Sequence, residues 1–238
     1  MNNVKFGITE HGDAGIDFSW EDKLLNANII ISKNLSDKLV EKLVRHKEKI
    51  IFHMTCTGFG GTIIEPNVHD YHWTHQQALK LIDRGFPVDQ IVLRVDPIIP
   101  TKKGLNTAKY VLDQFFDTGI KRVRYSFLDM YPHVIERFKR AGVYIPYSTF
   151  MVPINMVNDA MEILDYYEDK YELEACAENT KHKLGCISQK DFDILGIKEQ
   201  AAPAGFQRKG CLCIAGKTEL LTGKKQCPNK CLYCYWKG

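Results

Sequence analysis

The sequence has no long apolar run, no secretory-type start and no compositional bias. None of its apolar stretches approaches the ~18 residues that a membrane-spanning helix needs. The first twenty residues carry acids and glycines where a signal peptide has a basic start followed by an apolar run. Of 238 residues, 45% are hydrophobic and 26% are charged, which excludes disordered and fibrous classes. We therefore expect a cytoplasmic globular protein with no membrane partner.

Short β-branched runs alternate along the chain with longer amphipathic segments. The predicted strands cover residues 5–9, 28–32, 50–57, 91–99, 122–129 and 172–178, with a further extended piece over 143–152. The predicted helices cover residues 35–48, 74–86, 105–116, 133–140 and 154–170. Such alternation is typical of parallel βαβ units with right-handed crossovers. The length suits one barrel-sized domain.

The dinucleotide-binding fingerprint is missing. Gly58-Phe-Gly-Gly61 follows a predicted strand, but it lacks the third glycine and no helix opens directly behind it. This absence weakens the case for a doubly wound Rossmann sheet. We predict an α/β fold, a partial TIM-like parallel (β/α) barrel of about six strands. Reactive residues of a barrel gather at the C-terminal ends of its strands, where Thr55, Cys56, Asp96, Asp129 and Glu178 fall.

Positive charge and cysteine are concentrated near the C-terminus. The net charge is +3, but the segment 204–238 carries +6 and the rest of the chain −3. Five of the eight cysteines fall within the last 28 residues. Clustered cysteines in a reducing compartment bind metal more often than they form disulfides. We predict a barrel over residues 1–200 and a Cys-rich tail over 201–238 that closes the barrel mouth, as one structural unit.

The most specific motif is Cys227-Pro-Asn-Lys-Cys231-Leu-Tyr-Cys234, with the spacing C-x3-C-x2-C. Three thiolates on one short loop can bind three irons of a [4Fe–4S] cluster and leave the fourth iron open to a small molecule. The alternative is a zinc knuckle completed by Cys211, Cys213 or a histidine. The spacing favours the cluster over zinc.

These residues resemble two known families. A C-x3-C-x2-C loop with an aromatic residue before the last cysteine is the signature of radical S-adenosylmethionine (SAM) enzymes. The whole chain is similar to domain-of-unknown-function family 1848, whose C-terminal cysteines resemble that loop. The matching segments are Lys33-Asn34, 64–68, 94–99, 126–129 with Tyr131, 176–178, 185–187, Gln207-Arg208, Cys211 with Cys213, and 227–235. The resemblance implies a [4Fe–4S] cluster on Cys227, Cys231 and Cys234, SAM at its open iron, and an external electron donor.

Two features depart from the expected pattern. Family 1848 usually opens with a basic Ser-Arg-Arg-Thr-Asp stretch, whereas this chain has Thr9-Glu-His-Gly-Asp13. Any phosphate or carboxylate contact made by those arginines is therefore not carried over to this chain. Radical SAM enzymes generally carry the cluster loop after the first barrel strand. The resemblance thus implies a permuted loop that folds back over the barrel mouth.

Four other cysteines, Cys176, Cys186, Cys211 and Cys213, also lie in matching segments. Four thiolates could hold a second iron–sulfur cluster or a zinc ion that fixes the tail to the last strand. The alternative is that Cys176 and Cys186 are buried as small hydrophobic residues. Cys56 belongs to no matching segment, and we expect it in the core.

Charged residues interrupt apolar strands near their C-terminal ends. A buried strand hides charges only when they pair with one another, bind a ligand or line a polar cavity. Arg94 could bind the carboxylate of SAM, and Asp96 could bind a ribose hydroxyl or amine. The alternative is that both residues make internal ion pairs with other strands. We predict Arg94, Asp96 and Glu178 as catalytic residues. The residues predicted to contact the cofactor are Lys33, Thr55, Asn67, Ser126, Asp129, Tyr233 and Tyr235.

Two function classes fit these patterns. The first is a radical SAM enzyme that abstracts hydrogen from a small-molecule or nucleotide substrate, since the cofactor carries the hard chemistry. The basic, aromatic tail also admits a nucleic-acid base as substrate, in modification or repair. The same basic residues could simply offset the charge of an anionic cluster. The second class is a zinc-stapled or iron–sulfur nucleic-acid-binding adaptor without catalysis.

Overall fold

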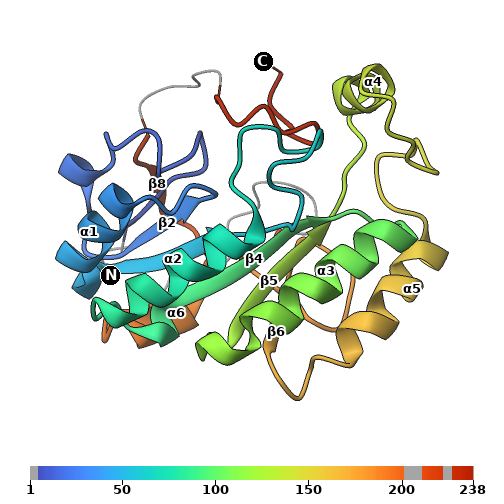
Figure 1. The fold of residues 1–238 in the computed structure, drawn as a ribbon. Coiled ribbons are helices and arrows are strands. Elements are labelled where there is room, and N and C mark those ends of the chain that lie inside the picture. Colours follow the sequence, from blue (N-terminus) through green and yellow to red (C-terminus); the bar gives the residue numbers. More distant parts are fainter. Residues whose placement is uncertain (1–4, 201–210, 222–226, 238) are drawn as a thin grey trace.

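The computed structural model describes residues 5–200, 211–221 and 227–237. Within them, one sheet of eight strands runs in the order β7-β6-β5-β4-β3-β2-β1-β8, and every neighbouring pair is parallel (Figure 1). The sheet curls into a half-barrel with β7 and β8 at its two edges. The strands are β1 (Phe6–Ile8), β2 (Asn28–Ser32), β3 (Ile50–Thr55), β4 (Ile91–Ile98), β5 (Arg122–Phe127), β6 (Glu172–Cys176), β7 (Lys183–Leu184) and β8 (Lys217–Glu219).

Helices α1, α2 and α3 begin at polar capping residues, and the helices follow the strands as crossovers. Ser36 accepts a hydrogen bond from the first turn of α1, and Asp70 does so for α2 at 2.9 Å. Pro132 occupies the first turn of α4, where its missing N–H costs nothing. The helices are α1 (Asp37–Arg45), α2 (Tyr71–Asp83), α3 (Lys102–Phe115), α4 (Pro132–Arg140), α5 (Ile154–Asp165) and α6 (Gln189–Ile194).

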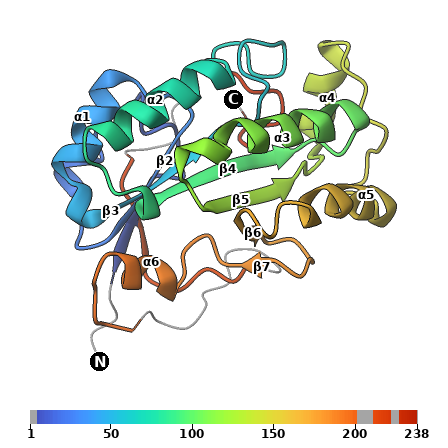
Figure 2. The same ribbon diagram turned by 60° about the horizontal axis from the view of Figure 1, so that its bottom comes forward.

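The two faces of the sheet carry separate cores because successive strand residues point to opposite sides. On the outer face, Phe52, Leu93 and Tyr125 pack under α1, α2, α3 and α5, which lie side by side in Figures 1 and 2. On the inner face, Ile51 and Val92 pack with Phe192 of α6, which Figure 2 shows away from the other helices. Helix α6 therefore fills part of the concave side.

A third apolar cluster lies beyond the C-terminal ends of the strands. Phe59, Ile64 and Leu128, from the loops after β3 and β5, pack with Phe138 of α4. Leu232 and Tyr233, from the segment 227–237, pack against this cluster. Figure 1 shows this segment, in red, beside the loop that follows β3. These contacts bring the C-x3-C-x2-C motif to the end of the sheet where a barrel enzyme has its active site.

The predicted parallel α/β fold is confirmed, but the predicted number of about six strands is wrong. The six predicted strands correspond to β1–β6, whereas β7 and β8 have two and three residues, too few to show a period. Residues 143–152 form no strand, and α5 ends at Asp165 rather than at residue 170. No helix among the described residues is long and apolar enough to cross a membrane.

Candidate metal centres on the half-barrel

A row of polar side chains crosses the concave face of the sheet. Thr55 on β3 is in register with Arg94 on β4, Arg94 with Arg124 on β5, and Arg124 with Glu174 on β6. Apolar neighbours such as Leu93 and Tyr125 point to the opposite face, into the core beneath the helices. The alternation of charged and apolar residues therefore concentrates charge inside the half-barrel.

Ion pairs link these charges. Arg94 pairs with Asp96, and the Ser126 hydroxyl donates to the same carboxylate. Arg94 and Asp96 therefore pair with each other within β4, whereas the alternative drawn from the sequence was ion pairs with other strands. On the next strands, Arg124 pairs with Glu174.

Arg122 ties the same network to α6. Its guanidinium donates to Glu174 at 3.3 Å and to Asp191 at 2.8 Å. Because all three side chains are at least 96% buried, removing one would leave an uncompensated charge. This network fixes α6 against the sheet.

Four cysteines meet on the same face. The Cys176 and Cys186 sulfurs are 2.6 Å apart, and the Cys186 N–H donates to the Cys213 sulfur at 3.2 Å. The hydrogen bond with Cys176 lowers the pKa of the Cys186 thiol well below its usual range. The hydrogen bond with Cys213 and the positive charges of Arg124 and Arg94 lower this pKa as well. Cys211 hydrogen-bonds in turn to the Cys213 thiol. All eight cysteines are free of disulfides.

Glycine and backbone strain shape the segments that carry these cysteines. A Cβ on Gly185 would lie 2.4 Å from the Leu212 carbonyl oxygen, so only glycine lets the two Cys-bearing segments touch here. Next to Cys176, Ala177 has φ of 60°, a left-handed conformation that costs a non-glycine residue about 1 kcal/mol or more. Lys230 in the downstream motif shares this feature, with φ of 52°. Strain of this kind concentrates at functional sites.

The downstream motif is anchored by amide hydrogen bonds. Buried Asn229 donates to Asp13 at 2.8 Å and accepts from Asn34 at 2.9 Å. Asn67, predicted to contact a cofactor, donates to the Pro228 carbonyl at 2.6 Å. The loops that follow β1, β2 and β3 thus hold the motif in one conformation.

Glu65 is the central contact between this motif and the sheet. Its side chain is 1% exposed, and its carboxylate accepts from Thr57 at 2.6 Å and from the Tyr233 hydroxyl. The Lys33 ammonium lies 3.0 Å from Glu65 and 5.2 Å from the Tyr233 ring centre. Burial lowers the pKa of Lys33, but the charges of Glu65 and Cys231 outweigh it and raise the pKa overall. A positive charge is therefore held beside Cys231.

The three motif cysteines lie at different depths. Cys231 is buried, whereas Cys227 and Cys234 are partly exposed. Burial raises the pKa of Cys231 to about 12, opposed by the charge of Lys33. Arg137 of α4 donates to the Cys234 carbonyl at 2.5 Å and to the Trp236 carbonyl at 2.6 Å. The three cysteines lie close enough for their charges to interact, on a loop held by Asn229 and Arg137.

The other predicted residues lie around this end of the sheet. Glu178 accepts from the Phe127 N–H at 2.9 Å, just beyond the ends of β5 and β6. The Tyr235 hydroxyl donates to the Glu10 carbonyl at 3.4 Å. Asp129 follows β5, and its charge helps burial to raise the pKa of Tyr147. The structure thus brings Lys33, Asn67 and Tyr233 to the motif and joins Arg94, Asp96 and Ser126 in one group.

Sequence reasoning missed three residues of this region: Glu65, Arg124 and His53. Arg122-Val-Arg124 and Glu172-Leu-Glu174 alternate charge with apolar residues, a period-two signal that could have placed Arg124 on the inner face. His53 is fully buried on β3, and neither ring nitrogen has a hydrogen-bond partner. Burial lowers its pKa well below the usual range, and the charges of Arg124 and Arg94 add to this effect. No sequence signal distinguishes it from a core residue.

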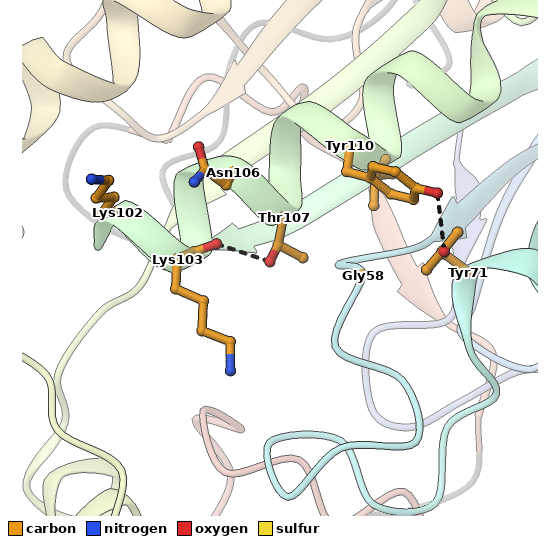
Figure 3. Close-up of a pocket in the computed structure, with 8 residues that line it drawn as sticks. Gly58, Tyr71, Lys102, Lys103, Asn106, Thr107 and Tyr110 are labelled. Atoms are coloured by element: carbon orange, nitrogen blue, oxygen red, sulfur yellow. Dashed lines mark hydrogen bonds between the residues drawn. The ribbon is translucent and has the colours of Figure 1, made fainter.

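Two other polar features lie apart from the cysteines. A cavity of about 680 Å³ opens between α3 and the start of α2, where Lys103, Thr107 and Tyr110 line it, and no cysteine does (Figure 3). Elsewhere, exposed Asp165 and Glu168 lie beside half-buried His182, and Lys181 pairs with both carboxylates. Among the described residues, this is the one set of three metal-ligating side chains whose ligand atoms lie within 4.8 Å of one another.

Comparison with family models matches residues 16–236 to a family described as a domain of unknown function, DUF1848. Comparison with curated proteins gives no match.

Proposed function

Since the chain belongs to the DUF1848 family, with several cysteines brought together at one end of a parallel half-barrel, we propose that it is a radical SAM enzyme. In this proposal, Cys227, Cys231 and Cys234 bind a [4Fe–4S] cluster. The observation that carries the proposal is the anchoring of the C-x3-C-x2-C loop by Glu65 and Asn229 beside the strand ends. A purely structural tail would not need three free thiols there.

The residues present fit such a group. Three thiols on one loop match a cluster with one iron left open for a small molecule. The Lys33 ammonium beside Cys231 offsets part of the negative charge that the thiolates bring. Ligation also removes the cost of keeping Cys231 ionised in a buried place, because metal binding displaces the thiol proton.

The cluster would supply the electron that cleaves SAM to methionine and a 5′-deoxyadenosyl radical, and an external donor would reduce it. The protein's own residues would bind and orient SAM and substrate and exclude water. Lys33 and Asp96 lie close enough to interact, so the Arg94–Asp96–Ser126 group reaches toward the motif. Glu178 extends the polar surface beyond β5 and β6. These groups are suited to the carboxylate, amine and ribose hydroxyls of SAM.

The basic charge and the aromatic residues of the tail support one substrate class. We propose a small molecule or nucleotide, with a nucleic-acid base as the larger variant, because the tail is basic. Of its basic residues, Lys217 pairs with Glu10 at 2.9 Å. The remaining basic residues between 201 and 226, namely Arg208, Lys209, Lys224 and Lys225, lie outside the described residues.

The test compares two Cys→Ala variants after anaerobic reconstitution with iron and sulfide. Cys231→Ala should lose the motif's iron and should form no 5′-deoxyadenosine from SAM under a strong reductant. Cys56→Ala is the matched control, because Cys56 is equally buried but belongs to neither group. The control should keep both properties. Equal iron content in the two variants, or a colourless protein that binds only zinc and nucleic acid, would replace the proposal with the non-catalytic adaptor.

A further inference from the structure

The structure assigns a second [4Fe–4S] site to Cys176, Cys186, Cys211 and Cys213, in which Arg94, Arg124 and His53 donate hydrogen bonds to the sulfur atoms of the cluster. These seven residues come from β3, β4, β5, β6 and the two segments around residues 186 and 212. They share the concave face of the sheet. The site does not depend on the proposed SAM chemistry at the downstream motif.

The cysteines are assembled by the fold rather than by a local motif. Contacts run from Cys176 to Cys186, to Cys213 and on to Cys211, across segments up to 27 residues apart. Cys186, Cys211 and Cys213 are each less than 8% exposed. The tight approach at Gly185 and the hydrogen bond from the Ile214 N–H to the Ile187 carbonyl, 3.2 Å, bring the segments together. Four thiols gathered in this way form a complete ligand set.

The spacing of the sulfurs favours a cluster over a single zinc ion. Zinc–sulfur bonds of about 2.3 Å in a tetrahedron place thiolates roughly 3.8 Å from one another. Among the described residues, no three of the cysteine sulfurs all lie within 4.8 Å of one another. A cubane binds each thiolate on a different iron, so it spreads its four ligands more widely than one ion does. The Cys176 and Cys186 sulfurs, 2.6 Å apart, are closer than either kind of site places its ligands, so these two side chains would separate when a metal group binds.

Unpartnered donors around the cysteines point to an anionic acceptor. Arg94 Nε, Arg124 Nε and Arg124 Nη1 are buried donors without a hydrogen-bond partner. The ring nitrogens of His53 also lack partners, and one of them carries the N–H of the neutral imidazole. A buried donor that is left without an acceptor destabilises the folded state. Arg94 donates to Asp96 through Nη2 alone, and Arg124 donates to Glu174 through Nη2 alone, so the other nitrogens named above keep no partner.

The same donors lie near the cysteine sulfurs. Cys186 and Cys176 are close enough to Arg94 and Arg124 for their charges to interact, and Cys186 does so with His53. Sulfides and thiolates of an iron–sulfur cluster accept hydrogen bonds, and such bonds set its reduction potential. A cluster bound here would give these buried donors their partners.

The test separates the two cysteine groups. In the triple variant Cys227→Ala, Cys231→Ala, Cys234→Ala, the proposal predicts about four iron and four sulfide per chain after anaerobic reconstitution. Adding Cys186→Ala to that variant should remove them, whereas adding Cys56→Ala should not. Retained iron in the triple variant supports the second site even if the wild-type protein never cleaves SAM. Zinc alone, or no metal, in a folded triple variant overturns it.

Two further measurements keep the proposal testable if the triple variant does not fold. The wild-type protein should hold about eight iron, and Cys186→Ala should hold about four. A wild-type value near four that Cys186→Ala does not change would overturn the proposal. His53→Leu should keep the iron content and shift the midpoint potential of the second cluster to a more negative value, because a donor to sulfur is lost. An unchanged potential would remove His53 from the site.

Discussion

Replacing Glu65 by glutamine should both destabilise the protein and loosen the cysteine loop. The carboxylate is 1% exposed and is shared by Lys33, Thr57 and Tyr233. Removing one partner of a buried ion pair costs about 3–5 kcal/mol, because the other charge stays buried. At the lower value, a chain of this length should lose roughly 6–12 °C in melting temperature. The Lys33 ammonium would then lack the charge that keeps it ionised.

The assay for Glu65→Gln is urea unfolding followed by circular dichroism, with iron content measured on the same samples after reconstitution. Glu136→Gln is the matched control, because Glu136 pairs with Arg140 on an exposed helix surface at 3.0 Å. Such a pair contributes about 0.5 kcal/mol or less. Lys33→Met completes a double-mutant cycle, in which we expect a coupling energy of about 1–3 kcal/mol between residues 33 and 65.

The result that refutes this reasoning is equal stability of Glu65→Gln and Glu136→Gln. It would mean that the ion pair beneath the loop is not a buried interaction. A destabilised Glu65→Gln variant with normal iron at Cys227, Cys231 and Cys234 would confirm the ion pair but would contradict its role in holding the motif.

Three further predictions concern the polar groups of the half-barrel. Burial raises the pKa of Glu174, but the charges of Arg124 and Arg122 outweigh this effect and lower the pKa overall. The ionised Glu174 side chain therefore stabilises the fold above about pH 4.5, and this stabilisation is lost as the pH falls through the lowered pKa. The free energy of unfolding, measured with urea between about pH 7 and 3, should therefore fall less steeply below about pH 4.5 in Glu174→Gln than in the wild type. Parallel curves of this free energy against pH would contradict the prediction. Glu178→Gln should keep a near-normal melting temperature, because its amide oxygen can still accept from the Phe127 N–H, but should form less 5′-deoxyadenosine. A variant that loses stability but forms 5′-deoxyadenosine at the normal rate would show that Glu178 is structural. Asn229→Ala should lower the free energy of unfolding by about 1–3 kcal/mol and lower only the motif's iron. Asn106→Ala, at an exposed position of α3, should change neither; equal loss of iron in both variants would count against the anchor.

Much of the fold could be predicted because its period-two and period-3.6 patterns are strong. Ile50–Thr55 and Arg122–Phe127 are buried strands that their β-branched and aromatic residues predict. The short strand Lys183–Leu184 has too few residues for a pattern, and its pairing depends on contacts made with β6 in the folded chain. Such elements are fixed by tertiary packing rather than by local preference.

The candidate site was only partly predictable for the same reason. The C-x3-C-x2-C spacing is local and is visible in the sequence. The meeting of Cys176 with Cys186 depends on the alignment of β6 with β7, which no spacing rule gives. Glu65 contacts the motif because the loop after β3 folds back under Tyr233. His53 is buried near the cysteines because the sheet curls around it. Such contacts between distant segments exist only in three dimensions.

The central claim is that the downstream cysteine loop binds a cluster whose open iron takes SAM. Its most direct test is the electron paramagnetic resonance spectrum of the reduced Cys186→Ala variant, in which only the cluster on Cys227, Cys231 and Cys234 should remain. We predict that adding SAM shifts the g values of this signal, because SAM becomes a ligand of the open iron. A [4Fe–4S] signal that SAM leaves unchanged, or the absence of any cluster signal from a folded variant, would contradict the account.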